Sequence, residues 1–429
     1  MALLVLALGL LAGRLLRFEP APASATSGRS GVAGMGAAAR ALGVTLALVA
    51  AAAALGWLPL PMVDGDLVPP EARASFGVGA LGLAPILTAS LLVALVVALV
   101  PRLRRLRGGT FLARRALAPA WLATTLALAA LQALPIATLY RQLAAGYGVD
   151  PGLAGGFALM GCLVLALLTL WGAAALISQH GVGHGLAVLL TGLTAVGLAR
   201  GESPIDARVC VLGAALGLLT LLLASRGVRV APDVVRRLPL AGFTPLDLGT
   251  ALLTLVALLP PLAALADAIA SMGLALEVAV MAALGLAIAW LLQRPRSLAG
   301  LGPATALSVA LIAAVAAAKK ADLSGAGAVA TLAFLPVLLA ARGGELAARA
   351  RLGALVRVTS TADVDRAGRL LELLAAAGVP AALRGVRTRA LLRFMGPWLP
   401  IEVLVPAPDR ERAVAVLRAE AEADVVGAF

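Results

Sequence analysis

Two histidines, His180 and His184, have the spacing that comes nearest to a metal site. Side chains four positions apart lie on one face of a helix, where two imidazoles can bind a metal ion. That helix is interrupted, however, by Gly181, Gly183 and Gly185, and no third ligand stands nearby in the sequence. We therefore expect no metal at this position.

The other reactive residue types show no catalytic arrangement. Cys162 and Cys210 both fall in apolar stretches, and their spacing fits neither a disulfide framework nor a metal site. The sequence shows no phosphate-binding glycine loop, no paired carboxylates inside apolar segments and no nucleophile beside a base. Asp267 and Glu277 lie near the ends of apolar segments, where a charge costs little, so a proton relay remains only a hypothesis. We expect a protein that is not an enzyme and needs no cofactor.

The composition excludes an ordinary soluble enzyme. Of the 429 residues, 61% are hydrophobic and 13% are charged, against about 45–50% and about 25% in typical globular proteins. The formal net charge of +13 is compatible with nucleic-acid binding or with a membrane protein whose cytoplasmic loops are rich in arginine. The placement of the arginines favours the membrane, and we expect no nucleic-acid partner.

Ten segments are apolar enough to predict membrane spans of about 20 residues. They run near 37–58, 77–100, 117–139, 153–177, 185–199, 208–224, 246–265, 273–292, 303–318 and 325–341. The two shortest, 185–199 and 303–318, must be partly buried in protein or lie in a thinned bilayer. The sequence thus predicts an all-α polytopic membrane protein with a packed bundle. Residues 1–12 are also apolar and are either a further anchor or an interfacial segment, and 18–36 is typical of a linker.

The basic residues predict the orientation, because cytoplasmic loops carry the excess of arginine and lysine. One set of alternating loops holds twelve basic residues, whereas the opposite set holds six together with eight acidic ones. The richer loops are 102–115, 226–237 and 294–296. With ten spans, both the N-terminal segment and the C-terminal tail are then cytoplasmic.

Two segments of the chain are alike and run in opposite directions across the membrane. Leu81–Leu92 and Leu240–Ala251 each contain Gly-x-x-Pro followed by an apolar stretch with Thr or Ser, which ends at Pro101 or Pro260. Such a pair is typical of two inverted five-helix repeats with a site at their interface. The alternative is that Gly, Pro and Thr are simply common in membrane helices.

Four motifs in order resemble the SecY family of protein-conducting channels. The sequence reads LPLP over 58–61, FGVGALGLAPILTAS over 76–90, ISQHGVGHG over 177–185 and LPLAGFTP over 238–245. These are similar to the family's IPIPG, F-x-LGI-x-PYI-x-AS, ITERGIGNG and NMAGVIP elements. The resemblance spans roughly residues 40–345 and implies a SecY-like membrane domain over 37–345.

The resemblance implies a ring of apolar side chains that seals an empty pore by excluding water. The positions matching this ring are Leu83, Leu87, Leu186, Leu190 and either Asp247 or Leu248. Ordinary helix packing is the alternative role for the four leucines of the second and fifth spans. A carboxylate at Asp247 would invite water into such a ring and argues against a tight seal.

The resemblance also implies a lateral gate between the second and seventh spans, and a plug formed by the segment between Pro61 and Gly79. The gate positions are Pro85, Thr88, Ser90, Pro245 and Thr250.

A docking surface for a motor or ribosome is implied on the cytoplasmic loops. Its basic residues are Arg226, Arg229, Arg236, Arg237, Arg294 and Arg296. These arginines alternatively fix the topology alone, and the family's Pro-Gly-x-Arg-Pro-Gly element is shortened here to 293–300.

The implied partners are SecE-like and SecG-like small membrane subunits, a SecA motor or a ribosome, unfolded polypeptide clients and the lipid of a bacterial plasma membrane. Two other functions stay open. One is a degenerate translocon that acts as a membrane scaffold, and the other is a secondary transporter of a small solute.

The composition changes at about residue 354, where charged residues become frequent again. The sequence predicts strands at 355–358, where apolar residues alternate, and at the short runs 381–387 and 401–405. It predicts a helix over 362–377, where leucines have helical spacing. With a closing helix over 408–422, the order is βαββα, a small cytoplasmic α+β domain over 354–429. It resembles a small ferredoxin-like family described only as signal-transducing, and SecY proteins do not ordinarily end in one.

Overall fold

The protein was described from a computed structural model. The residues it describes are 31–56, 58–60, 77–100, 102–103, 111–146, 152–200, 207–226, 271, 276, 279–280, 283, 287, 310–318, 321, 328–361, 364–391 and 398–426. The predicted span 246–265 lies outside these residues, as do most of 273–292 and the N-terminal segment 1–30.

Three helices in the described part of the chain are long and apolar enough to cross a membrane. They are α2 (Gly31–Leu55), α4 (Phe111–Gly146) and α5 (Gly152–His180). α4 runs beyond both ends of its predicted span and contains Pro119 and Pro135, which membrane helices tolerate because neighbouring groups satisfy the freed carbonyls. Three spans are therefore supported by length and composition, and the full set of ten remains a prediction.

Further helices pack against these three and against one another. α3 (Ala84–Leu99) packs on α4, α6 (Gly185–Arg200) packs on α5, and α12 (Ala328–Leu352) packs on both α2 and α7 (Ala207–Arg226). α3 and α6 have 16 residues each, about 24 Å at 1.5 Å per residue, which is short for a bilayer core of about 30 Å. They therefore depend on burial among their neighbours.

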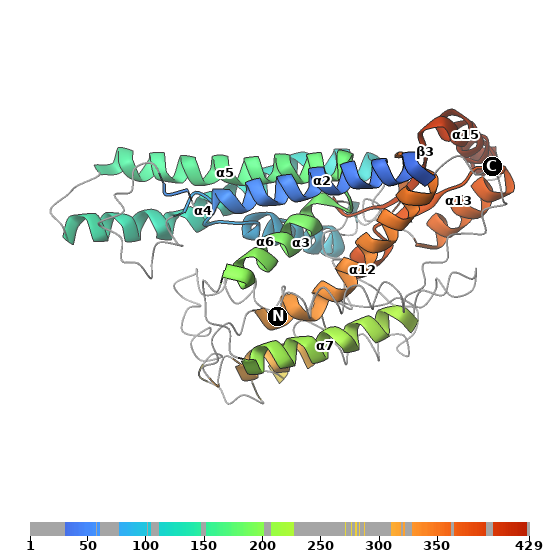
Figure 1. Cartoon of the computed structure of the whole chain (residues 1–429). Helices are drawn as coiled ribbons and strands as arrows, with labels where there is room; N and C mark the ends of the chain where they lie inside the picture. Colours follow the sequence, from blue (N-terminus) through green and yellow to red (C-terminus); the bar gives the residue numbers. More distant parts are fainter. Residues whose placement is uncertain are drawn as a thin grey trace.

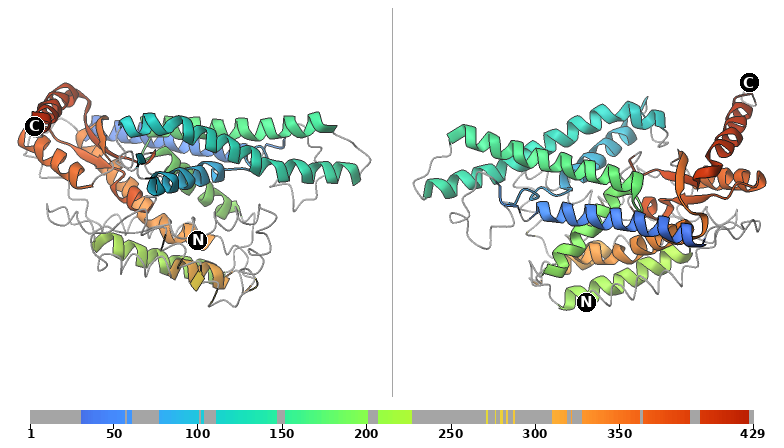
Figure 2. Two further views of the ribbon diagram at one scale, coloured as in Figure 1. Left: turned by 180° about the vertical axis from the view of Figure 1, so that it is seen from behind. Right: turned by 45° about the horizontal axis from the view of Figure 1, so that its top comes forward.

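The arrangement places the C-terminal domain at one end of the helical part. α2 and α5 lie side by side, and α12 leads obliquely to the C-terminal domain at the end of α2 (Figure 1). Figure 2 shows the same relation from two further directions. One continuous apolar core joins the described helices from α2 to α12.

The residues that follow α2 lie beside the residues that precede α3. Pro59 and Gly77 form an isolated antiparallel bridge, and Val78 N donates to Leu58 O at 2.8 Å. A Cβ on Gly79 would lie 2.9 Å from the backbone nitrogen of Gly56, so glycine is required for this approach. The residues just before the predicted plug, 58–59, therefore lie beside residues 77–78 at its end, whereas 61–76 lie outside the described part.

The C-terminal domain has the predicted order with one additional helix. Its elements are β1 (Leu355–Thr361), α13 (Val364–Ala376), β2 (Ala382–Arg384), α14 (Val386–Leu391), β3 (Ile401–Pro406) and α15 (Arg410–Val426). The sheet order is β1-β3-β2, and both pairings are antiparallel. The second strand is shorter than the predicted 381–387 because Gly385, with φ of +90°, ends it and α14 follows.

The domain has its own small apolar core. α13 and α15 pack on β1 and β3, and the core includes Leu374, Val403, Val405 and Ala413. α12 is continuous from the predicted tenth span to Leu352, and only two residues separate it from the start of β1 at Leu355. The domain is therefore attached through a helix and packs against it at β2 and α14.

Candidate functional site

Four of the predicted ring residues belong to the main apolar cluster or pack against it. Leu83 and Leu186 are buried, with 6% and 7% of their surface exposed, and both belong to the main core. Leu87 and Leu190 are partly buried and pack against the same core. The remaining candidates, Asp247 and Leu248, lie outside the described residues.

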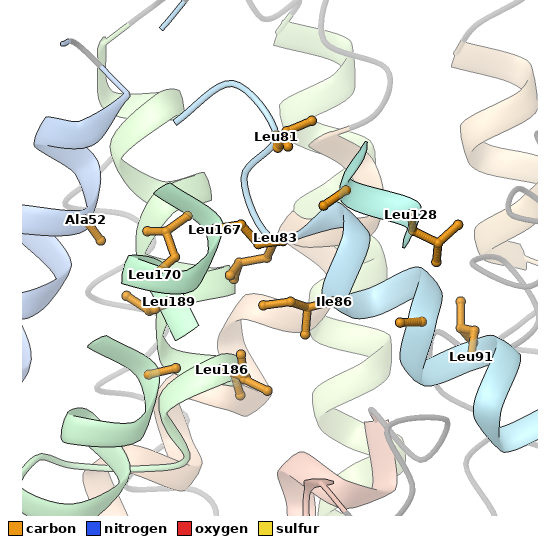
Figure 3. Close-up of a cluster of buried hydrophobic side chains, with 14 of the residues drawn as sticks. Ala52, Leu81, Leu83, Ile86, Leu91, Leu128, Leu167, Leu170, Leu186 and Leu189 are labelled. Carbon is orange, nitrogen blue, oxygen red and sulfur yellow. The ribbon is translucent and has the colours of Figure 1, made fainter. Parts of the chain in front are cut away.

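The cluster is formed by helices that are distant in the sequence. Figure 3 shows Leu83 and Ile86, at the start of α3, pointing toward Leu167 of α5 and Leu186 of α6. Ile86 is 1% exposed and Leu167 is 1% exposed. Closely packed apolar side chains of this kind leave no polar partner for water or ions.

The gate candidates on α3 differ in their surroundings. Pro85 is buried in the first turn and Thr88 is half-buried. Ser90 is buried, donates to Ile86 O at 2.7 Å and accepts a hydrogen bond from Trp121 Nε1 of α4 at 3.0 Å. Ser90 therefore ties α3 to α4, whereas Pro245 and Thr250 of the implied opposite side lie outside the described residues.

Trp121 is the centre of an aromatic group. The ring of Trp171 on α5 lies 5.5 Å from it between centroids, edge to face, and the ring of Trp398 lies 4.4 Å away at a tilt of 30°. Trp398 belongs to the C-terminal domain, just before β3, and its neighbour Leu399 is fully buried in the main core. The domain thus contributes side chains to the core of the helical part.

The motif over 177–185 forms a tight turn between α5 and α6. α5 ends at His180 and α6 begins at Gly185, so the two histidines do not share a helix. Gly183 has φ of +83°, and a Cβ on Gly185 would collide with the carbonyl of Ala174 in the last turns of α5. The glycines are therefore needed for the turn itself.

Two helices, α2 and α12, hold this turn through hydrogen bonds to its backbone. Val182 N donates to Thr45 Oγ1 of α2 at 2.8 Å, and Gly183 N donates to Glu345 Oε2 of α12 at 2.7 Å. Arg349 of α12 donates to Gly181 O at 2.9 Å and pairs with Glu345 at 3.0 Å. Buried backbone groups of the turn are thereby satisfied, as burial requires.

Arg384 connects the C-terminal domain to the same turn. Its Nη2 pairs with Glu345 Oε1 at 2.5 Å, and its Nη1 pairs with Glu402 Oε2 at 3.1 Å. Nη1 also donates to Ser178 O at 2.8 Å, one of the last carbonyls of α5, which have no partner within the helix. A cation is favoured at this end of a helix, and here the C-terminal domain supplies it.

The charges stabilise one another in their ionised forms. Burial by itself lowers the pKa of Arg384, but the carboxylates of Glu345 and Glu402 outweigh it and raise that pKa above its ordinary value. For the acid Glu402, burial acts in the opposite direction and raises the pKa. The positive charges of Arg384, then His184 and Arg357, outweigh burial and hold the pKa of Glu402 below its ordinary value. We call Glu345, Arg349, Arg384 and Glu402 the charge cluster.

The sequence prediction missed the charge cluster and the aromatic group. A partial signal existed, since Glu345 and Arg349 stand four apart, on one helical face. A second signal was Glu402, which interrupts the apolar run of β3. Nothing in the sequence indicated that Arg384, in a separate strand, would meet both acids.

The basic docking residues are largely outside the described part of the chain. Arg226 is the last residue of α7. The others, Arg229, Arg236, Arg237, Arg294 and Arg296, fall on residues the structure does not describe.

Comparisons with known proteins find similar chains among the solved structures. No family model matches the chain, and no curated protein matches it. Among solved structures, the chain is similar to Sec61 in the canine ribosome-channel complex from the endoplasmic reticulum, with 13% sequence identity and a TM-score of 0.45. The similarity covers 79% of this chain and 96% of that chain.

Proposed function

We propose that the chain is the pore subunit of a protein-conducting channel that translocates polypeptides or inserts them into a bacterial plasma membrane. The proposal takes Leu83, Leu87, Leu186 and Leu190 as the seal and α3 as one side of a lateral gate. It is a transport function without a catalytic step and without a cofactor.

One observation carries the proposal. Two motif segments about 100 positions apart in the sequence, one around Leu83 and one around Leu186, both contribute buried leucines to the main apolar core, which supports the proposal. An apolar cluster between helices seals against ions when empty and can be parted by a polypeptide without breaking ion pairs. A solute transporter would instead need polar or charged groups at its site.

The predicted topology is consistent with the contacts of the C-terminal domain. The turn between α5 and α6 and the C-terminal tail are both expected on the cytoplasmic side, and Arg384 joins them directly. Both terminal regions are accordingly assigned to the cytoplasm in this proposal.

The partners we propose are SecE-like and SecG-like small membrane subunits and unfolded polypeptide clients, with a SecA motor or a ribosome as the driving force. Purification of the tagged protein from native membranes tests this part. Recovery of small single-span subunits supports a working channel, whereas a chain recovered alone, or bound through its C-terminal domain only, favours the membrane scaffold.

Crosslinking of an arrested nascent chain tests the pore itself. In a background with Cys162→Ser and Cys210→Ser, single cysteines are placed by Leu83→Cys and Leu186→Cys. We expect both to crosslink to a cysteine in the arrested chain, because a translocating polypeptide must pass the seal.

The matched control is Leu165→Cys on the outer face of α5, where the leucine is 64% exposed. This position should not crosslink to a hydrophilic nascent chain. If positions 83 and 186 crosslink no more than position 165, the pore assignment is wrong.

A further inference from the structure

The contact between the C-terminal domain and the helical part has two separate components. One is the charge cluster at the turn between α5 and α6, and the other is the packing of Trp398 and Leu399 into the main core. The same small domain supplies both, because Arg384 is the last residue of β2 and Trp398 lies just before β3.

The aromatic component leads to α3 by a direct chain of contacts. Trp398 packs on Trp121 with 4.4 Å between ring centroids, and Trp121 Nε1 donates to Ser90 Oγ at 3.0 Å. Ser90 is itself bonded to Ile86 O, one turn earlier on α3, beside Leu83. A movement of α3 away from α4 must therefore break the Trp121–Ser90 bond or carry Trp121 away from Trp398.

The charge component keeps the domain in position for this contact. Arg384 bonds Ser178 O of α5 and Glu345 of α12, and both of its carboxylate partners are buried. A buried charge that loses its partner is strongly unfavourable. Release of the domain is consequently a discrete step that opens both components, and not a gradual loosening.

We propose that the C-terminal domain is a latch that holds α3 fixed on α4 through Trp398 on Trp121, and that α3 becomes free to move relative to its neighbours when the domain leaves. The latch rests on the proposed function, in which α3 parts sideways to release apolar segments. It assigns the domain a role in gating, by a contact within the same chain.

Thiol accessibility on α3 tests the latch in the full-length protein in lipid nanodiscs. In the background without native cysteines, Val93→Cys reports on α3, where the valine is 8% exposed. Loss of an aromatic pair changes an equilibrium by up to about tenfold. We therefore expect Trp398→Ala to raise the rate of maleimide labelling at position 93 by roughly that factor, and Trp398→Phe to leave it near the parent value.

A second reporter separates gating from general unfolding. Leu163→Cys on α5 replaces a fully buried leucine, and its labelling should stay slow in every variant. Equal acceleration at positions 93 and 163 overturns the latch, as does an unchanged rate at position 93 in Trp398→Ala.

A third variant, Arg384→Gln, breaks the contact of the charge cluster with the turn between α5 and α6. It should also accelerate labelling at position 93. If it does not, the charge cluster is not part of the latch and the proposal fails. The matched control is Arg357→Gln, which removes a 54% exposed partner of Glu402 without touching the helical part. None of these rates requires polypeptide transport, so the latch and the channel assignment succeed or fail separately.

Discussion

At the residue scale, the charge cluster sets how the domain responds to acid. Glu402 is 5% exposed at its side chain and pairs with Arg384 and Arg357. Its pKa in the folded protein lies below the ordinary value of 4.5 despite burial, because the cations outweigh desolvation. A carboxyl group with a lowered pKa stabilises the fold above its unfolded pKa, and this contribution is lost as pH falls through the lowered value.

We predict that the stability of the C-terminal domain is nearly constant from neutral pH to about pH 5. The stability then decreases as the pH drops below about 4.5, the pKa of this group in the unfolded chain. One such group gives a slope of at most about 1.4 kcal/mol per pH unit. Amide hydrogen exchange of β3 in the full-length protein, measured as a function of pH, gives the opening free energy.

The variant Glu402→Gln is expected to lose about 3 kcal/mol at neutral pH, because it deprives a buried guanidinium of one partner. Its remaining acid dependence should be shallower than that of the parent. The control Arg357→Gln should cost about 0–1 kcal/mol, as an exposed pair does. An unchanged acid slope in Glu402→Gln would mean that another carboxyl group controls the transition.

At the scale of elements, the turn between α5 and α6 depends on close backbone contact. A Cβ on Gly185 meets the carbonyl of Ala174, and this backbone atom cannot rotate away. We predict that Gly185→Ala destabilises the protein by about 3 kcal/mol or more, the upper range for forced overpacking. Thermal unfolding of the purified protein in detergent measures the loss.

The control is Gly172→Ala on the exposed face of α5, where an added Cβ meets nothing within 4 Å. Alanine has the higher helix propensity, by about 1 kcal/mol. This change should be neutral or stabilising. Equal losses at positions 172 and 185 would contradict the close contact.

The success of sequence reasoning varies from element to element. Long apolar segments such as 153–177 gave α5 within a few residues, because hydrophobicity over about 20 positions is a strong signal. The break at 181–185 followed from its glycines. The helix α12 continues beyond the end of the tenth predicted span at 341, through a more polar stretch to Leu352.

The contacts of the C-terminal domain could not be predicted in the same way. Trp398 lies in a short non-repetitive segment with no periodicity that would indicate a buried face. Arg384 looked like a solvated residue at the end of a strand, because arginine is mostly exposed unless paired. Its two acids come from α12 and β3, and only the tertiary fold brings them together.

At the scale of the whole molecule, the exposed apolar face of α5 indicates where lipid contacts the protein. Leu153, Phe157 and Leu165 are 68%, 69% and 64% exposed, and their helix is long enough to cross a bilayer. We predict that nitroxide labels at 157 and 165 in nanodiscs are relaxed by oxygen, which dissolves in lipid, and shielded from a water-soluble nickel complex.

Labels at Leu163 and Leu167, which are buried on the inner face, should be shielded from both reagents. Power-saturation electron paramagnetic resonance gives the two accessibilities at each position. High nickel accessibility at positions 157 and 165 would mean that this face of α5 lies in water and not in the membrane.

The grouping of the tryptophans has an optical consequence. The chain has five tryptophans, and the ring centroids of Trp398 and Trp171 lie 4.4 and 5.5 Å from that of Trp121. Indole rings at such separations couple their electronic transitions, which gives paired bands of opposite sign in circular dichroism. The attachment of the C-terminal domain therefore has an intrinsic spectroscopic signature, readable in the unlabelled protein.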